Sequence, residues 1–295
     1  MSSIPPAGLQ PRPTEPLLSR PGIRTRDRRA PARQGSCGVV AMLPRTARRA
    51  AARRAFTLIE LLVVVAIIAL LISILLPALS RTKEQAKLVV CESNLRSLGL
   101  AVLMYTEANR GWFPQWGFAH GGGEAGAEHA WINTASKEYG ENRNVLRCPT
   151  DRSGLWNQPA RPGGPLRRTS YATNYYVVTG GEDNPLWERD RVAYNRIDNV
   201  RHPSTTIFFV ELTETGDFAL SDHVHPHEWA DFYPEHEKQA ATQVALARHL
   251  GRSCYAMVDG HAEALPFDRT FKIRTLVGGD TPEWLFNKYD PTIAR

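Results

Sequence analysis

The sequence predicts an α+β protein in which one long N-terminal helix packs against an antiparallel sheet. Three features predict this fold: an apolar run near residues 58–79, an apolar repeat of three and four residues after it, and β-rich segments beyond residue 170. The predicted parts are a basic leader at 1–55, a transmembrane helix at 56–80, its amphipathic continuation at 81–110 and an α+β head at 111–295.

The positive charge of the chain is concentrated in the leader. Residues 1–55 hold twelve arginines against one Asp and one Glu, whereas residues 56–295 hold 24 basic and 28 acidic side chains. A nucleic-acid-binding domain should have a basic face of its own, so we expect no nucleic acid as a partner. The leader is rich in Pro and Arg and has no apolar period, which predicts disorder. A start at Met42 would leave a shorter basic leader.

The apolar run has the length of a membrane span. Every residue from Leu61 to Leu76 is apolar except Ser73, and about 20 apolar residues cross a bilayer as a helix. Five arginines at positions 45, 48, 49, 53 and 54 precede the run, and fewer basic residues follow it. The positive-inside rule then places the leader in the cytoplasm and the head on the other side of the membrane.

Glu60 is the unusual residue of this run. An ionised carboxylate in hydrocarbon costs roughly 2.5–3.5 kcal/mol, so its charge should find a partner unless the side chain snorkels to the membrane surface. A secretory signal cleaved near Ala78-Leu79-Ser80, a twin-arginine signal at Arg53-Arg54 and a plain anchor are alternative interpretations of the run. None of the three explains Glu60.

A family resemblance does explain it, through the segment ARRAFTLIELLVVVAIIALLISILLPAL. This segment resembles the start of type IV prepilin-like proteins, including the type II secretion pseudopilins. The resemblance implies cleavage by a prepilin peptidase after Ala55, where the family usually has Gly, and N-methylation of the new terminus at Phe56. It also implies that Glu60 pairs with the N-terminal amine of a neighbouring subunit, and that Pro77 is the proline that bends the helix in many pilins.

The same resemblance implies a pilin-like fold and a structural role. The protein would be a pseudopilin-like subunit of a type II secretion-like or type IV pilus-like assembly, with prepilin peptidase and other pilin-like subunits as partners. It would cross the bacterial inner membrane once, with its head in the periplasm. The alternative is a bitopic membrane protein whose periplasmic head binds a metal or another ligand and does not polymerise.

Beyond Pro77 the apolar residues recur on one face of a helix. They are Leu88, Cys91, Leu95, Leu98, Val102 and Tyr105. This face predicts packing against the head. Asn109-Arg110-Gly111 should end the helix, because Gly is favoured just after a helix C-terminus.

The head contains three β-rich segments and two short helical ones. Strands are expected in 170–180 and 204–212, and a hairpin in 253–265 around Asp259-Gly260. Helices are expected near 128–139 and 234–250. The sequence also resembles the H-x9-DG subgroup of prepilin-like proteins, through Cys91, Cys148-Pro149, and His249 followed after nine residues by Asp259-Gly260.

His249 and Asp259-Gly260-His261 permit a catalytic interpretation with His as base and Asp as its orienting partner. An Asp-Gly turn between strands explains the same residues without chemistry, and no recognised catalytic motif accompanies them. We therefore expect no enzyme and no cofactor.

Two further groups could form sites. His223, His225, His227 and His236 are weak metal-ligand candidates, but Pro226 interrupts them and a polar loop has the same composition, so the favoured interpretation has no metal. Cys37 would be lost on processing. Cys91–Cys148 is the preferred disulfide in an oxidising periplasm, with Cys254 left over, although all three pairings remain open.

Overall fold

The structure is a computed structural model, and its described residues are 56–124, 126–275 and 282–294. Thr57–Arg295 forms one compact unit of the chain. The predicted leader, residues 1–55, lies outside the described residues, and so does Ala55, the predicted residue before the processing site.

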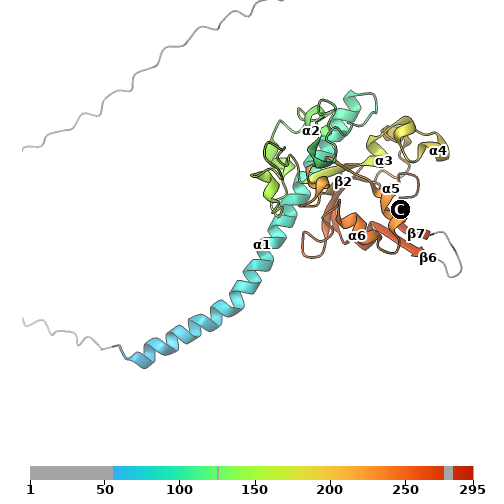
Figure 1. Ribbon diagram of the computed structural model, residues 1–295. Coiled ribbons are helices and arrows are strands. Elements are labelled where there is room, and N and C mark those ends of the chain that lie inside the picture. Colours follow the sequence, from blue (N-terminus) through green and yellow to red (C-terminus); the bar gives the residue numbers. More distant parts are fainter. Residues whose placement is uncertain (1–55, 125, 276–281, 295) are drawn as a thin grey trace, which may run out of the picture. The chain divides into compact units, whose positions relative to one another are not determined.

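One long helix, α1, spans Leu58–Ala108 (Figure 1). Its 51 residues correspond to about 77 Å of helix at the usual rise per residue. Pro77 lies inside α1 and does not end it. The apolar segment and the amphipathic segment predicted from the sequence are therefore parts of one continuous helix.

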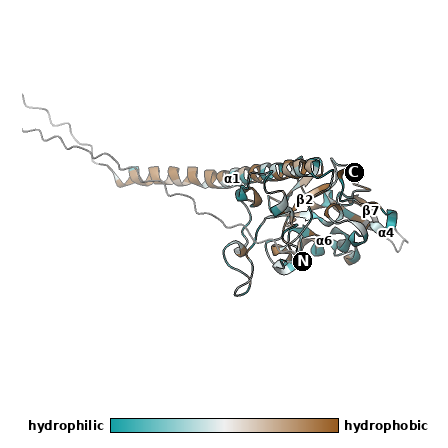
Figure 2. Ribbon diagram, turned by 90° about the horizontal axis from the view of Figure 1, so that it is seen from above, coloured by the Kyte–Doolittle hydropathy of each residue, from teal (hydrophilic) through white to brown (hydrophobic). Residues whose placement is uncertain are grey.

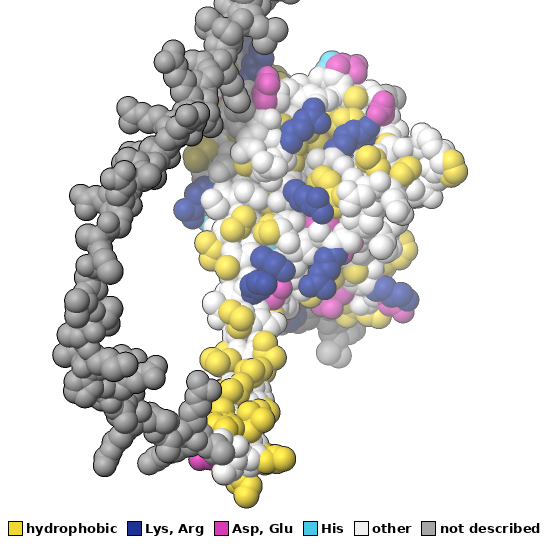
Figure 3. All heavy atoms as spheres, turned by 90° about the vertical axis from the view of Figure 1, so that its left-hand side faces the viewer, with side chains coloured by type: hydrophobic (Ala, Val, Ile, Leu, Met, Phe, Trp, Pro, Cys, Tyr) yellow, Lys and Arg dark blue, Asp and Glu magenta, His cyan; other side chains and the backbone are white. Residues whose placement is uncertain are grey.

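The N-terminal half of α1 has an apolar surface that the rest of the structure does not cover. Every residue from 57 to 83 is exposed, and the large apolar side chains from Leu58 to Leu79 are 47% to 79% exposed. Figure 2 shows this half as hydrophobic, and Figure 3 shows its apolar side chains extending beyond the head. By length and composition α1 can cross a membrane, and an apolar surface of this size needs either lipid or other protein around it.

The C-terminal half of α1 packs into the head along one face. Its buried residues are Leu88, Cys91, Leu95, Leu98, Gly99, Ala101, Val102 and Thr106. The predicted apolar face is confirmed apart from Tyr105, which is only half-buried. Spacings of three and four residues keep these side chains on one side of the helix, so they meet the sheet together.

The head contains a five-stranded sheet in the order β3-β1-β2-β4-β5. The strands are β1 (Tyr171–Asn174), β2 (Ile207–Glu211), β3 (His223–Val224), β4 (Ser253–Met257) and β5 (Ala262–Leu265). All neighbours are antiparallel except β1 and β3, which are parallel. Helix α1 packs on β4, β5 and β2, which confirms the predicted α+β fold. A separate antiparallel pair consists of β6 (Phe271–Thr275) and β7 (Pro282–Asn287).

The remaining helices of the described residues are short. They are α2 (Trp131–Thr134), α3 (Tyr175–Val178), α4 (Trp187–Asp190), α5 (Pro226–Trp229) and α6 (His236–Ala241), together with several single 3₁₀ turns. The predicted helices near 128–139 and 234–250 therefore exist only as the single-turn α2 and the slightly longer α6. The strand predicted over 170–180 ends at Asn174, whose side chain accepts a hydrogen bond from Tyr176 N at 3.2 Å and starts α3 instead.

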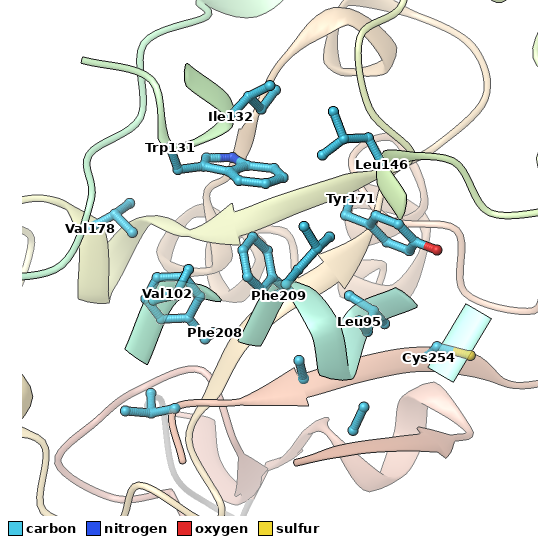
Figure 4. Packing of buried hydrophobic residues seen from close by; sticks show 14 of the residues in the cluster. Leu95, Val102, Trp131, Ile132, Leu146, Tyr171, Val178, Phe208, Phe209 and Cys254 are labelled. Atoms are coloured by element: carbon cyan, nitrogen blue, oxygen red, sulfur yellow. The ribbon is translucent and has the colours of Figure 1, made fainter. Parts of the chain in front are cut away.

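The main core lies between α1, the sheet and the loop that contains α2. Leu95 and Val102 of α1 lie beside Phe208 and Phe209 of β2, and Trp131 belongs to the same core cluster (Figure 4). The rings of Trp131 and Phe209 meet edge to face at 4.8 Å between centroids. This packing fixes β1, β2 and the loop before α2, on which the polar clusters of the head are built.

Candidate functional site

The start of α1 forms a capping box between Thr57 and Glu60. The Glu60 carboxylate accepts hydrogen bonds from Thr57 N and Thr57 Oγ1, both at 2.9 Å, and Glu60 N donates to Thr57 Oγ1 at 3.2 Å. These bonds satisfy the Glu60 carboxylate within its own chain, and its predicted pairing with the N-terminal amine of a neighbouring subunit stays a prediction. The segment Thr57-Leu58-Ile59-Glu60 has the S/T-x-x-E spacing of a capping box, so the local partner could have been found from the sequence.

The capping box leaves the charge of Glu60 uncompensated. Thr57 is neutral, and among the described residues no Lys, Arg or His forms an ion pair with Glu60. By contrast, the neutral hydroxyls further along α1 are satisfied within the helix: Ser73 Oγ donates to Leu70 O at 2.7 Å and Thr82 Oγ1 to Ala78 O at 3.0 Å. Glu60 is thus the charged side chain in the apolar half of α1, held by hydrogen bonds and without an ionic partner among the described residues.

Cys91 and Cys148 meet in a buried cluster in the head with Glu211 and His249. One ligand atom from each of the four residues lies within 4.8 Å of the others. The structure does not contain the predicted Cys91–Cys148 disulfide, because both residues are free thiols. Each thiol has other polar neighbours: Cys91 Sγ lies 3.3 Å from the Tyr171 hydroxyl and 3.3 Å from Glu211 Oε1, and Cys148 Sγ lies 3.3 Å from His249 Nε2.

The centre of this cluster is an ion-pair network. Glu211 Oε1 lies 3.2 Å from Arg248 Nη1 and 3.2 Å from His249 Nε2, while Glu211 Oε2 accepts from Cys254 N at 2.8 Å. Burial alone would raise the pKa of Glu211, but the hydrogen bond to His249 and the charge of Arg248 lower it to about 2. Thiolates, imidazole and carboxylate can bind zinc, yet here Arg248 already supplies positive charge at the carboxylate.

His249 and Asp259 do not meet. They lie beyond opposite ends of β4, and Asp259 Oδ1 is instead 2.6 Å from the Nδ1 atom of the exposed His261. The predicted hairpin between β4 and β5 is confirmed, and Gly260 at its turn has a φ of +87°. A Cβ atom on Gly99 of α1 would lie 3.0 Å from the Gly260 Cα atom. The Asp259-Gly260 turn therefore packs directly on α1, which gives it a structural role.

The histidine-rich loop divides into separate groups. His223 and His225 lie beside His120, a residue that the sequence interpretation did not include, while His225 also lies near His227 and Glu228. His236 stands apart and stacks on Tyr233 at 5.9 Å between ring centroids. Burial, together with the neighbouring His223, lowers the pKa of His120 to about 4 and that of His225 to about 2. Both imidazoles are neutral near pH 7, which leaves their nitrogen lone pairs available.

Glu211, Arg248 and His120 are the polar residues that sequence reasoning missed. Glu211 lies in a β-rich segment whose pattern predicts a buried apolar strand. His120 is about a hundred residues from the histidines beside which it lies. Only the arrangement of the strands brings these residues to their partners. The sequence offered one local signal, the charged Glu211 within a strand that is otherwise apolar. A buried charge needs a partner, so this residue indicated a polar cluster in the core.

A family model described as the prokaryotic N-terminal methylation motif matches residues 51–76. No curated protein and no solved structure matches the chain. The matched segment contains Ala55, Phe56 and Glu60 and covers most of the exposed apolar half of α1. The motif and the helix together support a type IV prepilin-like protein, anchored in a membrane through α1. Membership of the H-x9-DG subgroup stays a prediction.

Proposed function

We propose that the protein is a non-enzymatic, pseudopilin-like structural subunit of a type II secretion-like or type IV pilus-like assembly. Prepilin peptidase would cleave after Ala55 and methylate Phe56, and other pilin-like subunits would surround α1 in the inner membrane. The observation that carries the proposal is Glu60, a carboxylate that has no ionic partner within the described part of the chain and that lies in an exposed apolar helix bearing the methylation motif.

The proposed contact follows from the charges. Cleavage before Phe56 creates a positive amine at the start of the apolar segment, and the Glu60 carboxylate of another subunit can meet that amine. A charge that is buried alone in an apolar environment is costly, whereas a hydrogen-bonded pair is tolerated. Subunits that pack their apolar helices together would therefore stack in the register that joins amine and carboxylate.

The capping box provides a way to separate assembly from helix stability. Glu60→Gln removes the charge but keeps an oxygen that can accept from Thr57, because Gln also fits the capping box. Thr57→Val removes the capping hydroxyl but keeps the charge. We expect Glu60→Gln and Glu60→Ala to remain membrane-inserted and processed to Phe56 but to lose cross-linking to other pilin-like subunits by at least about tenfold. Thr57→Val should retain that cross-linking, because a cap stabilises a helix by only about 1 kcal/mol.

The measurements are membrane fractionation, the mass of the mature N-terminal peptide and in vivo cross-linking from the apolar half of α1. Wild-type cross-linking of Glu60→Gln would contradict the proposed charge pairing. Loss of cross-linking in Thr57→Val but not in Glu60→Gln would assign Glu60 to helix capping alone.

A second candidate function is the bitopic protein with a metal-binding head, which the grouping of His120, His223 and His225 favours. This function needs no contact between α1 helices. Wild-type behaviour of all three variants, together with metal binding by the head, would support it over the assembly role.

A further inference from the structure

Three imidazole rings from two separate segments meet beside β3. His120 comes from the loop after α1, and His223 and His225 come from β3 and the residue that follows it. The distances between ring centroids are 5.2 Å for His120–His223, 4.9 Å for His120–His225 and 4.9 Å for His223–His225. A tetrahedral ion with imidazole nitrogens at about 2.0–2.1 Å holds ring centroids about 5 Å apart. The rings already have the spacing that such an ion requires.

Asp222 orients the ring of His223. His223 Nδ1 lies 3.1 Å from Asp222 Oδ1, so its Nε2 is the nitrogen available to a ligand. The Asp222 carboxylate is itself fixed, because it is fully buried and accepts from Gly117 N at 2.9 Å and Phe118 N at 3.1 Å. A carboxylate behind a histidine is the usual outer partner of a metal-bound imidazole, since it sets the tautomer and makes the ring more basic.

His225 contributes a buried nitrogen that has no partner in the described part of the chain. Its Nε2 is buried without a hydrogen bond, whereas its Nδ1 lies 3.7 Å from Glu228 Oε1. Tyr175 stacks on the ring at 4.4 Å between centroids and limits its movement. A buried polar atom without a partner is costly in a protein interior, and a bound cation would remove that cost.

We propose that His120, His223 and His225 form a three-histidine site for a divalent transition-metal ion such as Zn²⁺. Neutral imidazoles suit zinc, copper and nickel better than magnesium or calcium. His120 also lines a pocket of about 860 Å³ together with Asp217 and Leu220, so solvent or a small ligand can reach the His120 side of the site. The site does not depend on the proposed assembly role of α1.

Two other groups are weaker candidates for the same ion. His225, His227 and Glu228 lie close together, but the carboxylate paired with the His227 ring is that of Glu228, 4.0 Å from its Nε2 and itself a member of the group, whereas Asp222 orients His223 from outside the three histidines. The Cys91 cluster already holds Arg248 beside its carboxylate, and that charge opposes a cation. The test must therefore distinguish all three groups.

The test is metal titration of the full-length, detergent-solubilised and metal-free protein under reducing conditions. We expect one Zn²⁺ per chain and, with Co²⁺ as a spectroscopic probe, a tetrahedral absorption spectrum without a thiolate-to-cobalt charge-transfer band. His120 is exposed, so His120→Ala should fold normally. That variant should weaken zinc binding by at least about 100-fold, because losing even an outer partner of a metal ligand costs about 10–100-fold.

The matched control is His129→Ala, which removes another exposed histidine outside the three groups. It should leave zinc binding unchanged, as should His227→Ala. The proposal is overturned if no stoichiometric zinc binds or if His129→Ala weakens binding as much as His120→Ala. Binding that requires His227 but not His120, or a cobalt charge-transfer band that disappears in Cys91→Ser, would overturn it by placing the ion in another group.

Discussion

Glu211 is the residue on which the polar interior of the head depends. It is fully buried at the end of β2, and its carboxylate binds the side chains of Arg248 and His249, the thiol of Cys91 and the backbone N–H of Cys254. These partners come from α1, β4 and the segment before β4. Removing one partner from such a network leaves buried charge uncompensated, which costs several kcal/mol in measured cases, roughly 3–5.

The charge of His249 makes the stability of the head depend on pH. Burial alone lowers the pKa of His249, but the hydrogen bonds to Cys148 and Glu211 outweigh burial and raise it from 6.5 to about 9. The folded state therefore binds a proton more tightly than the unfolded state does. The resulting stabilisation, on the order of 3 kcal/mol, is complete below pH 6.5 and is lost as the pH rises toward 9.

We expect the free energy of unfolding, measured by urea denaturation of the reduced, solubilised protein, to fall between pH 6.5 and pH 8.5. His249→Gln should be less stable at pH 6.5 and should show little change over this range. Thiol ionisation in the unfolded state also lowers stability, but mainly above about pH 8.5. A slope in His249→Gln equal to that of the wild type would show that His249 is not protonated in the fold.

At the scale of elements, α1 joins two environments in one continuous helix. Its first half could be predicted from the sequence because the apolar run and the FTLIE segment are local signals. Its second half could be predicted because the apolar period marks the buried face. Tyr175–Val178 could not be predicted in the same way: these residues have strand propensity, but the cap formed by Asn174 turns the chain into a helix.

Replacing Gly99 of α1 with Ala has two opposing effects on the free energy of unfolding: higher helix propensity raises it, and overpacking against the β4–β5 turn lowers it. Within a helix, Gly→Ala normally stabilises by about 0.5–1 kcal/mol. Here the added Cβ would lie 3.0 Å from Gly260 Cα and 3.1 Å from Gly260 O, and both contacts are with backbone. Overpacking of this kind typically costs about 1–3 kcal/mol, so we expect Gly99→Ala to lower the free energy of unfolding.

The control for Gly99→Ala is Gly154→Ala, where an added Cβ would meet nothing within 4 Å. Urea denaturation should show a loss of stability for Gly99→Ala and little change for Gly154→Ala. Stabilisation by Gly99→Ala would mean that the β4–β5 turn does not press on α1, and that the Asp259-Gly260 pair needs another explanation.

At the scale of the whole molecule, local sequence patterns predict the helix α1 but do not predict the polar clusters inside the head. The anchor and its Glu60 are contiguous, so their chemistry can be read directly from residues 53–79. The cluster around Glu211 joins residues that are 37 to 120 positions apart, from Arg248 to Cys91, and His120 is about a hundred residues from His223. Such contacts follow from strand order and register, which local periodicity does not determine.

The basic residues on the two sides of the apolar segment predict the orientation of the molecule in the membrane. Five arginines at positions 45, 48, 49, 53 and 54 precede the apolar segment, whereas Arg81, Lys83 and Lys87 follow it. Because the more basic flank stays in the cytoplasm, a periplasm-dependent reporter fused after Arg295 should be active. Replacing Arg45, Arg48 and Arg49 with Ser reduces this asymmetry while keeping the processing segment, and should lower the reporter activity. Activity from a cytoplasmic reporter at the same position in the wild type would contradict the proposed orientation and place the three-histidine site in the cytoplasm.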